Sequence, residues 1–413
     1  MNVEFVTKNR LCVGCGLCED VCPKKCITIK RYRGELRPVV NSTSCLGMKC
    51  KRCLKVCPGV EMNLNVMANM LFCDNTIKED RCIGRYVALH IGYSRDKDIR
   101  FHSASGGMVS QFLIYLLEKN IIDGAVVTGF GKDHLTPLSY IARTKDEIVN
   151  ARSSKYCPVA LNKMGDKVAH LDGKYVIVGL PCHIQGFRKR MANDKHLREK
   201  VVGLFAIYCS SGRNYYAQDY LLYHYGFKRN ELNYFAFRDN GCLGNLLIES
   251  ESGKHLEVPF SNYYGRMLRS FFKPHRCLTC IDHYGELADV CFGDIHIKPY
   301  SDDHVGINSW ITRTNYWEQQ FKNAAKEGYV KMDDVDAETL NNSQATMLYP
   351  KKRRAKAVMN MDRLAGRSIP KYDKSLERPR LKDYISEVVC MCQQFIGRRK
   401  PLWFIIEFIN RNK

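Results

Sequence analysis

The pattern of apolar and polar residues changes at about residue 82. Beyond it, short runs rich in Val, Ile and Gly alternate with stretches in which apolar residues recur every three or four positions. Runs of the first kind are typical of buried strands, and the second spacing places side chains on one face of a helix. We predict strands over 123–129, 175–179 and 201–208 and a helix over 108–119. This alternation favours a mixed α/β domain, and the chain as a whole is expected to combine α+β and α/β parts.

The bulk composition is that of a globular protein. Of 413 residues, 45% are hydrophobic and 26% charged, which is enough apolar material for two or three domains and argues against a fibrous or low-complexity protein. The opening MNVEFVTKNR lacks the apolar centre of a secretory signal, and no run of about eighteen apolar residues could cross a membrane. We therefore expect a cytoplasmic protein whose 20 cysteines are reduced rather than joined in disulfides.

Eight cysteines form two runs of the kind that binds iron–sulfur clusters. The first run is Cys12-x-x-Cys15-x-x-Cys18-x-x-x-Cys22-Pro23, and the second is Cys45-x4-Cys50-x-x-Cys53-x-x-x-Cys57-Pro58. Three cysteines at short intervals let one loop present three thiolates to three irons, while the cysteine before the proline binds the other cluster of a two-cluster ferredoxin. The pattern predicts a ferredoxin-type domain over residues 1–82.

The crossed arrangement gives each [4Fe-4S] cluster a ligand set. The first set is Cys12, Cys15, Cys18 and Cys57, and the second set is Cys45, Cys50, Cys53 and Cys22. Zinc also accepts four thiolates and is the alternative, although zinc sites rarely carry two such runs that each end in Cys-Pro. Cys26, Cys73 and Cys82 have no place in this scheme and are expected to be small buried side chains.

Four further cysteines could form a third ligand set. Cys182 and Cys209 follow the predicted strands 175–179 and 201–208, and open α/β sheets place ligands at the carboxyl ends of their strands. Downstream, Cys277-x-x-Cys280 adds a close pair. These four thiolates could hold a third [4Fe-4S] cluster. The spacing alone leaves a zinc site and unrelated core cysteines open.

The predicted helix over 108–119 begins directly after Ser105-Gly106-Gly107. Unpaired amides and the positive end of the helix dipole favour an anion at such a start, and the glycines would let a phosphate approach the main chain. A plain helix N-cap is the alternative.

Basic residues exceed acidic ones by 64 to 43, which gives a formal charge of +21. The excess is largest over 351–382, which has twelve basic and three acidic residues. We expect this segment to be a solvated surface tail. Such a charge attracts polyanions and acidic proteins, so an acidic electron-transfer protein such as ferredoxin, or a phosphorylated cofactor, is the expected partner. No known nucleic-acid-binding motif accompanies the charge, which argues against nucleic acid as a partner. The aromatic-rich segment 398–409 could be a membrane-surface or partner helix, or could dock on its own protein.

Several short motifs of the body occur in the order of a known family. The chain resembles the coenzyme F420 hydrogenase/dehydrogenase beta-subunit family over roughly residues 85–300, with a ferredoxin domain fused ahead of it. The motifs are Ser105-Gly106-Gly107, Ser154-Lys155-Tyr156, Gly179-Leu180-Pro181-Cys182, Phe205 to Cys209, Cys277-x-x-Cys280-x-Asp282, Ala288-Asp289 and Gly293-Asp294.

The resemblance implies a flavoprotein in which FAD exchanges hydride with a substrate and single electrons with an adjacent cluster. It maps Ser105, Gly106, Gly107, Ser154, Lys155 and Tyr156 onto the flavin-binding segments, and Cys182, Cys209, Cys277 and Cys280 onto a cluster beside the flavin. Cys157 and Cys291 stand where an aliphatic or small residue is expected in relatives, and we interpret both as core packing, with a ligand role as the alternative. The flavin and iron–sulfur domain is expected over 83–345, followed by a basic, partly helical extension over 346–413.

The leading hypothesis is thus an iron–sulfur flavoprotein oxidoreductase, with F420 or another soluble metabolite as its two-electron partner. A flavin is needed because clusters carry one electron at a time whereas hydride donors give two. An electron-transfer subunit without its own substrate is the second hypothesis. A zinc-structured nucleic-acid-binding protein is the third, and the two Cys-Pro runs disfavour it.

Overall fold

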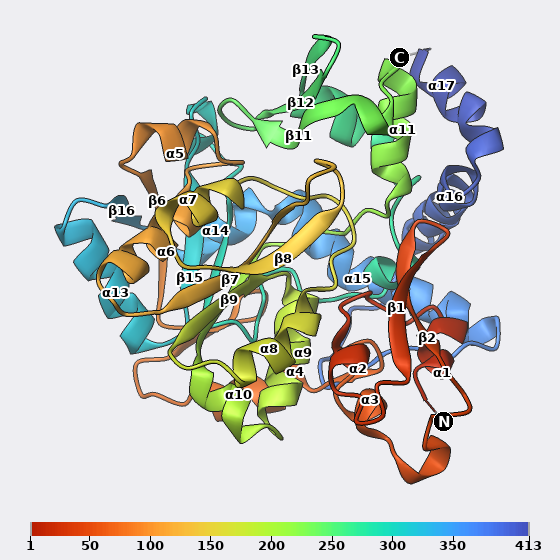
Figure 1. Ribbon diagram of the computed structural model, residues 1–413, viewed down its shortest axis with the longest axis horizontal. Helices are drawn as coiled ribbons and strands as arrows, with labels where there is room; N and C mark the ends of the chain where they lie inside the picture. Colours follow the sequence, from red (N-terminus) through yellow and green to blue (C-terminus); the bar gives the residue numbers. More distant parts are fainter. Residues whose placement is uncertain (1, 412–413) are drawn as a thin grey trace.

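The computed structural model describes residues 2–411. Its first part is a small lobe around an antiparallel strand pair, in red at the lower right of Figure 1. The lobe is built from α1 (Glu4–Lys8), α2 (Leu17–Asp20), β1 (Ile27–Tyr32), β2 (Glu35–Val40), η1 (Gly47–Lys49) and α3 (Arg52–Lys55). Gly16 starts α2 with a left-handed φ of 86°, and a Cβ at this position would lie 2.5 Å from Cγ of Lys163. The lobe therefore packs closely on the body of the protein.

The body is organised around an eight-stranded mixed sheet in the order β16-β6-β15-β14-β10-β9-β7-β8. Its strands are β6 (Ala88–Ser94), β7 (Gly124–Phe130), β8 (Pro137–Ala142), β9 (Tyr175–Gly179), β10 (Val201–Ile207), β14 (Val290–Asp294), β15 (Asn308–Thr312) and β16 (Val330–Asp334). The four central strands β7, β9, β10 and β14 are parallel, and antiparallel strands extend the sheet on both sides. The segments that follow the parallel strands therefore meet at one edge, named the carboxyl edge here.

Helices cover both faces of the sheet, because its central strands are apolar on both sides. On β10, Phe205 packs into the core under α6 and α13, whereas its neighbours Leu204 and Ala206 pack into the core under α9 and α15. The covering helices are α6 (Met108–Glu118), α7 (Lys145–Asn150) and α13 (Asn315–Lys326) on the first face, and α4 (Leu64–Leu71), α9 (Pro181–Met191), α10 (Lys195–Lys200) and α15 (Ala345–Leu364) on the second.

A second, smaller sheet lies beyond the carboxyl edge, at the top of Figure 1. It contains β11 (Leu232–Asp239), β12 (Asn245–Ser250) and β13 (His255–Pro259) and packs with α11 (Tyr216–Tyr225) and the π-helix η4 (Ser261–Leu268). The last helix, α17 (Trp403–Arg411), inserts Trp403 and Ile406 into the same core. The aromatic-rich end of the chain thus docks partly on its own protein.

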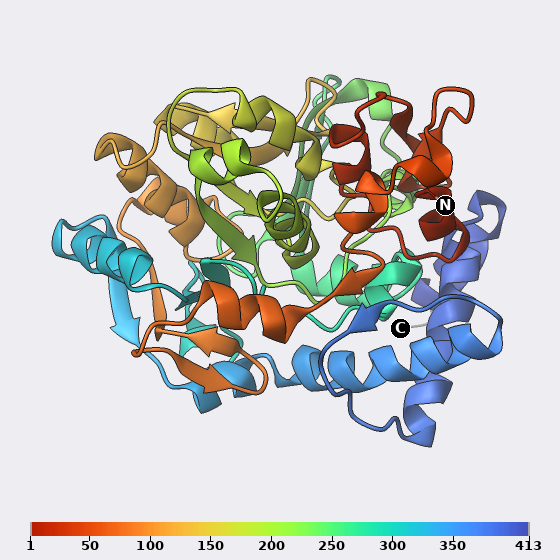
Figure 2. The same ribbon diagram turned by 90° about the horizontal axis from the view of Figure 1, so that it is seen from below.

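The C-terminal part wraps back over the earlier parts of the molecule, and Figure 2 shows the long blue helix α15 running along the lower side. It consists of α14 (Ala337–Ser343), α15, β17 (Lys371–Tyr372), α16 (Leu381–Gly397), η6 (Lys400–Leu402) and α17. β17 pairs in parallel with β3 (Glu61–Met62), which directly follows the second cysteine run. The expectation of a solvated tail over 351–382 is wrong, because Arg353 pairs with Asp383 at 2.7 Å and Arg354 pairs with Glu387 inside this part.

The predicted mixed α/β fold is confirmed, with β9 at the predicted residues. The three-part division of the chain stays a prediction, and its ends at residues 1 and 412–413 lie outside the described residues. The hairpin of β4 (Lys78–Asp80) and β5 (Gly84–Tyr86) spans the expected boundary at 82/83. No helix among residues 2–411 is long and apolar enough to cross a membrane.

Candidate redox-cofactor site

The first cysteine set is brought together in the interior of the lobe. Burial is the main cause that raises the pKa of Cys12 to about 12, and the nearby Cys57 adds to this rise. Burial likewise raises the pKa of Cys15, with added contributions from Cys57, Cys18 and Cys12. The N–H of Gly14 donates to Sγ of Cys12 at 3.4 Å. The last cysteine of the second run therefore lies among the first three of the other run, as crossed ligation requires.

The second cysteine set lies nearer the surface and has an unexpected neighbour. Burial raises the pKa of Cys53, and the nearby Cys50 and Cys45 raise it further. Sγ of Cys26 lies 3.4 Å from Sγ of Cys22, and Cys45 is also nearby. Cys26 is buried as predicted, but the spacing of the run did not predict that it touches a cysteine of this set.

The third cysteine set meets at the carboxyl edge. Cys182 is the second residue of α9 after β9, and Cys209 follows β10. Cys277 and Cys280 come from and just after α12 (His275–Leu278). Burial raises the pKa of Cys182, and Cys209, Cys280, Cys277 and also Cys15 raise it further. The third set therefore lies beside the first set.

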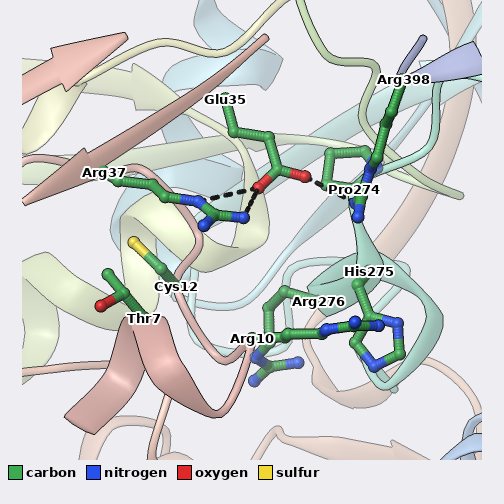
Figure 3. A pocket seen from close by; sticks show the side chains of 9 residues that line it. All are labelled: Thr7, Arg10, Cys12, Glu35, Arg37, Pro274, His275, Arg276 and Arg398. Carbon is green, nitrogen blue, oxygen red and sulfur yellow. Dashed lines mark hydrogen bonds and ion pairs between the residues drawn. The ribbon is translucent and has the colours of Figure 1, made fainter. Parts of the chain in front are cut away.

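Arg276 lies between these two sets. Its Nη1 donates to Oγ1 of Thr279 at 3.2 Å and its Nη2 to the carbonyl of Pro58 at 3.5 Å. Figure 3 shows it with other basic side chains around a small pocket beside Cys12, where Glu35 pairs with Arg37 and with Arg398, each at 2.7 Å. Basic side chains therefore gather beside Cys12 of the first set.

Ser105, Gly106 and Gly107 lie at the predicted helix start, because α6 begins at Met108. The loop packs tightly: a Cβ on Gly106 would lie 2.9 Å from both the amide of Asn308 and the carbonyl of Gly92. The N–H of Met108 donates to Oδ1 of Asn308 at 3.1 Å, so one of the amides expected to be free for a phosphate has a protein partner. Asn308 is a helix cap that the local sequence did not predict.

The second predicted segment, Ser154 to Tyr156, follows α7. Nζ of Lys155 donates to the carbonyls of Ala151 and Ser153 at 2.6 and 3.2 Å, and burial lowers its pKa to about 7. Lys155 therefore binds backbone carbonyls at the end of α7.

The two predicted flavin segments approach the same connection between β11 and β12. Ser105 interacts with the thiol of Cys242 in this connection. Oγ of Ser153, the residue before the second segment, donates to the carbonyl of Arg238 near the end of β11. Arg238 is buried, pairs with Asp294 at 2.9 Å and interacts with the hydroxyl of Tyr156.

Tyr264 connects this region to the third cysteine set. Its ring centroid lies 4.5 Å from that of Tyr156, and the guanidinium of Arg213 lies 4.4 Å from the centroid of the Tyr264 ring. Burial raises the pKa of Tyr264, and Cys209 is among the charges that raise it further. Arg213, Arg238 and Tyr264 lie in no motif of the sequence, and their position follows from the fold of the second sheet.

The cysteines predicted to lie outside the three ligand sets differ in how deeply they are buried. Cys157 and Cys291 are buried, as core packing predicts. Cys82 is only partly buried. The prediction for Cys73 is wrong: it is exposed, because the buried Phe72 ends the packed face of α4 and the chain turns outward after it. Within the described part of the chain, no three His, Cys, Asp or Glu side chains converge closely enough to bind a single metal ion.

Three family models match the chain. The model described as coenzyme F420 hydrogenase/dehydrogenase, beta subunit N-term, covers residues 89–164, and the one for the C terminus of the same subunit covers 172–338. A 4Fe-4S dicluster domain covers 11–59, which agrees with iron–sulfur rather than zinc in the lobe.

Relatives and one solved structure agree with these matches. The coenzyme F420 hydrogenase subunit beta of Methanothermobacter thermautotrophicus is 27% identical over 62% of this chain and 86% of its own length. The coenzyme F420-dependent sulfite reductase of Methanocaldococcus jannaschii is 27% identical over 80% of this chain and 48% of its own length. A chain of the F420-reducing [NiFe] hydrogenase complex from Methanosarcina barkeri shares the fold, with a TM-score of 0.53 at 21% identity over 70% of this chain and 94% of that chain. The protein is therefore an iron–sulfur member of the coenzyme F420 hydrogenase/dehydrogenase beta-subunit family, an oxidoreductase family, with a 4Fe-4S dicluster domain in residues 11–59.

Proposed function

We propose that this protein is an iron–sulfur flavoprotein oxidoreductase that passes electrons between three [4Fe-4S] clusters and FAD. F420 or another soluble metabolite would exchange hydride at the flavin. The observation that carries this proposal is the position of the third cysteine set. Cys182 of this set lies near Cys15 of the first set, and Cys209 lies near Tyr264, which neighbours Tyr156 and Arg238. This arrangement gives an order for the redox groups: second set, first set, third set, flavin.

The cysteines fit the proposed clusters. Each set supplies four thiols. Burial raises the pKa of the four thiols of the first set and of Cys53, Cys182, Cys209 and Cys277, so these eight thiols would lose a proton on binding iron. The proposed ligands are Cys12, Cys15, Cys18 and Cys57, then Cys45, Cys50, Cys53 and Cys22, and finally Cys182, Cys209, Cys277 and Cys280. The gathering of cysteines from separate segments at the carboxyl edge supports the third cluster over isolated core cysteines.

The residues around Tyr264 fit a bound anionic, aromatic cofactor. Nη2 of Arg238 and Nε of Arg213 are buried and have no hydrogen-bond partner among residues 2–411. Buried groups of this kind normally have a partner, and phosphate or ring oxygens of FAD would supply one. Tyr156 and Tyr264 would line the site of the isoalloxazine ring. When bound, FAD supplies a carrier that exchanges two electrons with a substrate and one with a cluster. Ser105 to Gly107 and Ser154 to Tyr156 are the proposed further contacts.

The electron partner is proposed to dock at the second cluster. A hollow beside it is lined by Lys24, Lys25 and Lys30, with Cys26 in its wall 3.4 Å from Cys22. An acidic electron-transfer protein such as ferredoxin would be attracted to these charges and would come close to a cluster ligand. The exposed aromatic residues Phe404 and Phe408 of α17 leave a peripheral membrane contact as a further proposal.

The test compares Cys280→Ser with Cys291→Ser in the full chain, purified without oxygen. C280S should lose one cluster, about four irons, and keep the spectroscopic signals of the two lobe clusters. C291S is the matched control, because Cys291 lies in the core of β14 and should keep all the iron. Equal iron in C280S and wild type would remove the third cluster, and loss of all clusters in C280S would mean that the assignment of sets is wrong.

A second candidate function is electron transfer within a larger complex, without a substrate of its own. It is favoured by the relatives whose names describe them as parts of a complex. One of these belongs to the F(420)H(2) dehydrogenase of Methanosarcina mazei and is 24% identical over 77% of this chain and 84% of its own length. Oxidation of reduced F420, or transfer of ferredoxin electrons to a dye, by the isolated protein with FAD supports the first function. Turnover that appears only when a partner protein is added supports the second.

A further inference from the structure

A lysine of α15 reaches the third cysteine set from outside the matched family region, which ends at residue 338. Nζ of Lys351 donates to the carbonyl of Cys209 at 2.6 Å and to the carbonyl of Asp282 at 2.7 Å. Both acceptors belong to segments that carry the third set, since Cys209 is a member and Asp282 follows Cys280. The ammonium group therefore joins the two halves of the set.

This ammonium also interacts with the sulfurs. Burial lowers the pKa of Lys351, but Cys280, Cys209, Asp282 and Cys277 more than reverse this effect, so the pKa is raised overall. Lys351 therefore lies beside three of the four thiols of the set, those of Cys209, Cys277 and Cys280.

The position of Lys351 is fixed by the packing of the C-terminal part. Ala355 and Val358, one and two turns further along α15, are buried. The neighbouring lysine points elsewhere: Nζ of Lys352 donates to the carbonyls of Arg81 and Cys82 at 3.1 and 3.4 Å. Tyr372 of β17 links the C-terminal part to the third set a second time. Its hydroxyl donates at 3.0 Å to the carbonyl of Thr279, which lies between Cys277 and Cys280 in the sequence. The C-terminal part therefore covers the third set.

We propose that Lys351 is a positioning residue that holds the third cluster site together and sets the potential of its cluster. The proposal rests on the third cluster of the proposed function. Reduction adds one electron and no proton to a cluster that four thiolates already make negative. A nearby ammonium in a poorly solvated site stabilises the more negative, reduced state more than the oxidised state, and so raises the reduction potential.

The test is a redox titration of the full-length protein, followed by electron paramagnetic resonance. The signal of the third cluster is identified as the one that C280S removes. Lys351→Met should lower its midpoint potential so that the oxidised-to-reduced ratio at a fixed potential rises at least tenfold, about 59 mV for one electron. Lys351→Arg, which keeps the charge, should stay closer to wild type. Lys352→Met is the matched control and should leave this potential unchanged, because its ammonium binds other carbonyls.

Each outcome decides the proposal. A midpoint potential in K351M equal to that of wild type would overturn it. If K351M does not hold the third cluster, Lys351→Gln is titrated instead with the same criterion, and failure of both neutral variants to hold the cluster would overturn the role in setting the potential. If wild type shows only two clusters and C280S changes no signal, the proposed third cluster itself fails, which the iron content shows independently of any lysine variant.

Discussion

Replacement of Arg238 by Met tests the proposed flavin site most sharply. Arg238 lies in β11, and its Nη1 pairs with Oδ2 of Asp294 at 2.9 Å while its Nε donates to the carbonyl of Leu243 at 2.6 Å. Its guanidinium lies 4.9 Å from the ring centroid of Phe260. The third nitrogen, Nη2, has no partner within the described residues. We expect this nitrogen to bind FAD.

The variant has two separable costs. Removal of one partner from a buried ion pair destabilises a protein by about 3–5 kcal/mol, because the other charge stays buried. Loss of a hydrogen bond from a charged donor to the cofactor costs about 1.5–3 kcal/mol, or roughly a tenfold to hundredfold weaker binding. R238M alone would mix these effects. The double variant R238M/D294N removes both charges and should recover much of the stability while still binding FAD weakly.

The assay is FAD binding by flavin fluorescence, together with chemical denaturation, both without oxygen. Wild type, R238M, R238M/D294N and D294N are compared, and D294N shows what the carboxylate itself contributes. Arg238→Lys keeps the charge and should bind FAD more tightly than R238M. A folded R238M/D294N protein that binds FAD as tightly as wild type would refute the role assigned to Arg238.

Three further predictions follow from burial and charge. Trp403→Ala should lower the free energy of unfolding by about 3–5 kcal/mol, because Trp403 anchors α17 in the core. Phe404 is 63% exposed, so Phe404→Ala should change this free energy little. Equal effects of the two variants in chemical denaturation would contradict the docking of α17. Glu318 is buried, which raises its pKa, but hydrogen bonds from His90 and Thr312 lower the pKa overall to about 2. Its stabilising contribution, about 3 kcal/mol, should therefore be complete above pH 5 and fall as the pH drops from about 4.5 toward 2. Glu318→Gln should lose this part of the acid sensitivity, and an unchanged acid profile would contradict the assignment. In stopped-flow measurements at low salt, the charge reversal K24E/K25E should slow electron exchange with an acidic ferredoxin by at least tenfold, and the difference should fade at high salt. A rate that changes neither with this substitution nor with salt would place the docking surface elsewhere.

The sequence predicted elements whose signals are local. The run at 175–179 is β9 because five consecutive residues of low polarity fit a strand buried on both faces. The two Cys-Pro runs predicted the lobe, because a cluster loop needs its thiolates at short intervals. The rule that strand ends meet at one edge could predict that Cys182 and Cys209 lie together. It could not predict that Cys280, almost a hundred residues after Cys182, joins them.

Contacts between distant segments could not be predicted in this way. Lys351 belongs to a run of four basic residues that is typical of a solvated surface, yet its ammonium binds the carbonyl of Cys209. Asn308 caps α6 from the start of β15, two hundred residues away in the chain. Arg238 has no local pattern at all, and only the packing of the second sheet on the carboxyl edge places it beside Tyr156. Each position is set by tertiary packing, which no short window of sequence contains.

We propose that three [4Fe-4S] clusters and one FAD form a single chain of redox groups in this protein. The most direct measurement is the content of iron, acid-labile sulfide and flavin in the full chain purified without oxygen. We expect roughly twelve irons, about as much sulfide and one FAD per chain. About eight irons without flavin would contradict it, because the residues at the carboxyl edge would then hold neither the third cluster nor its partner.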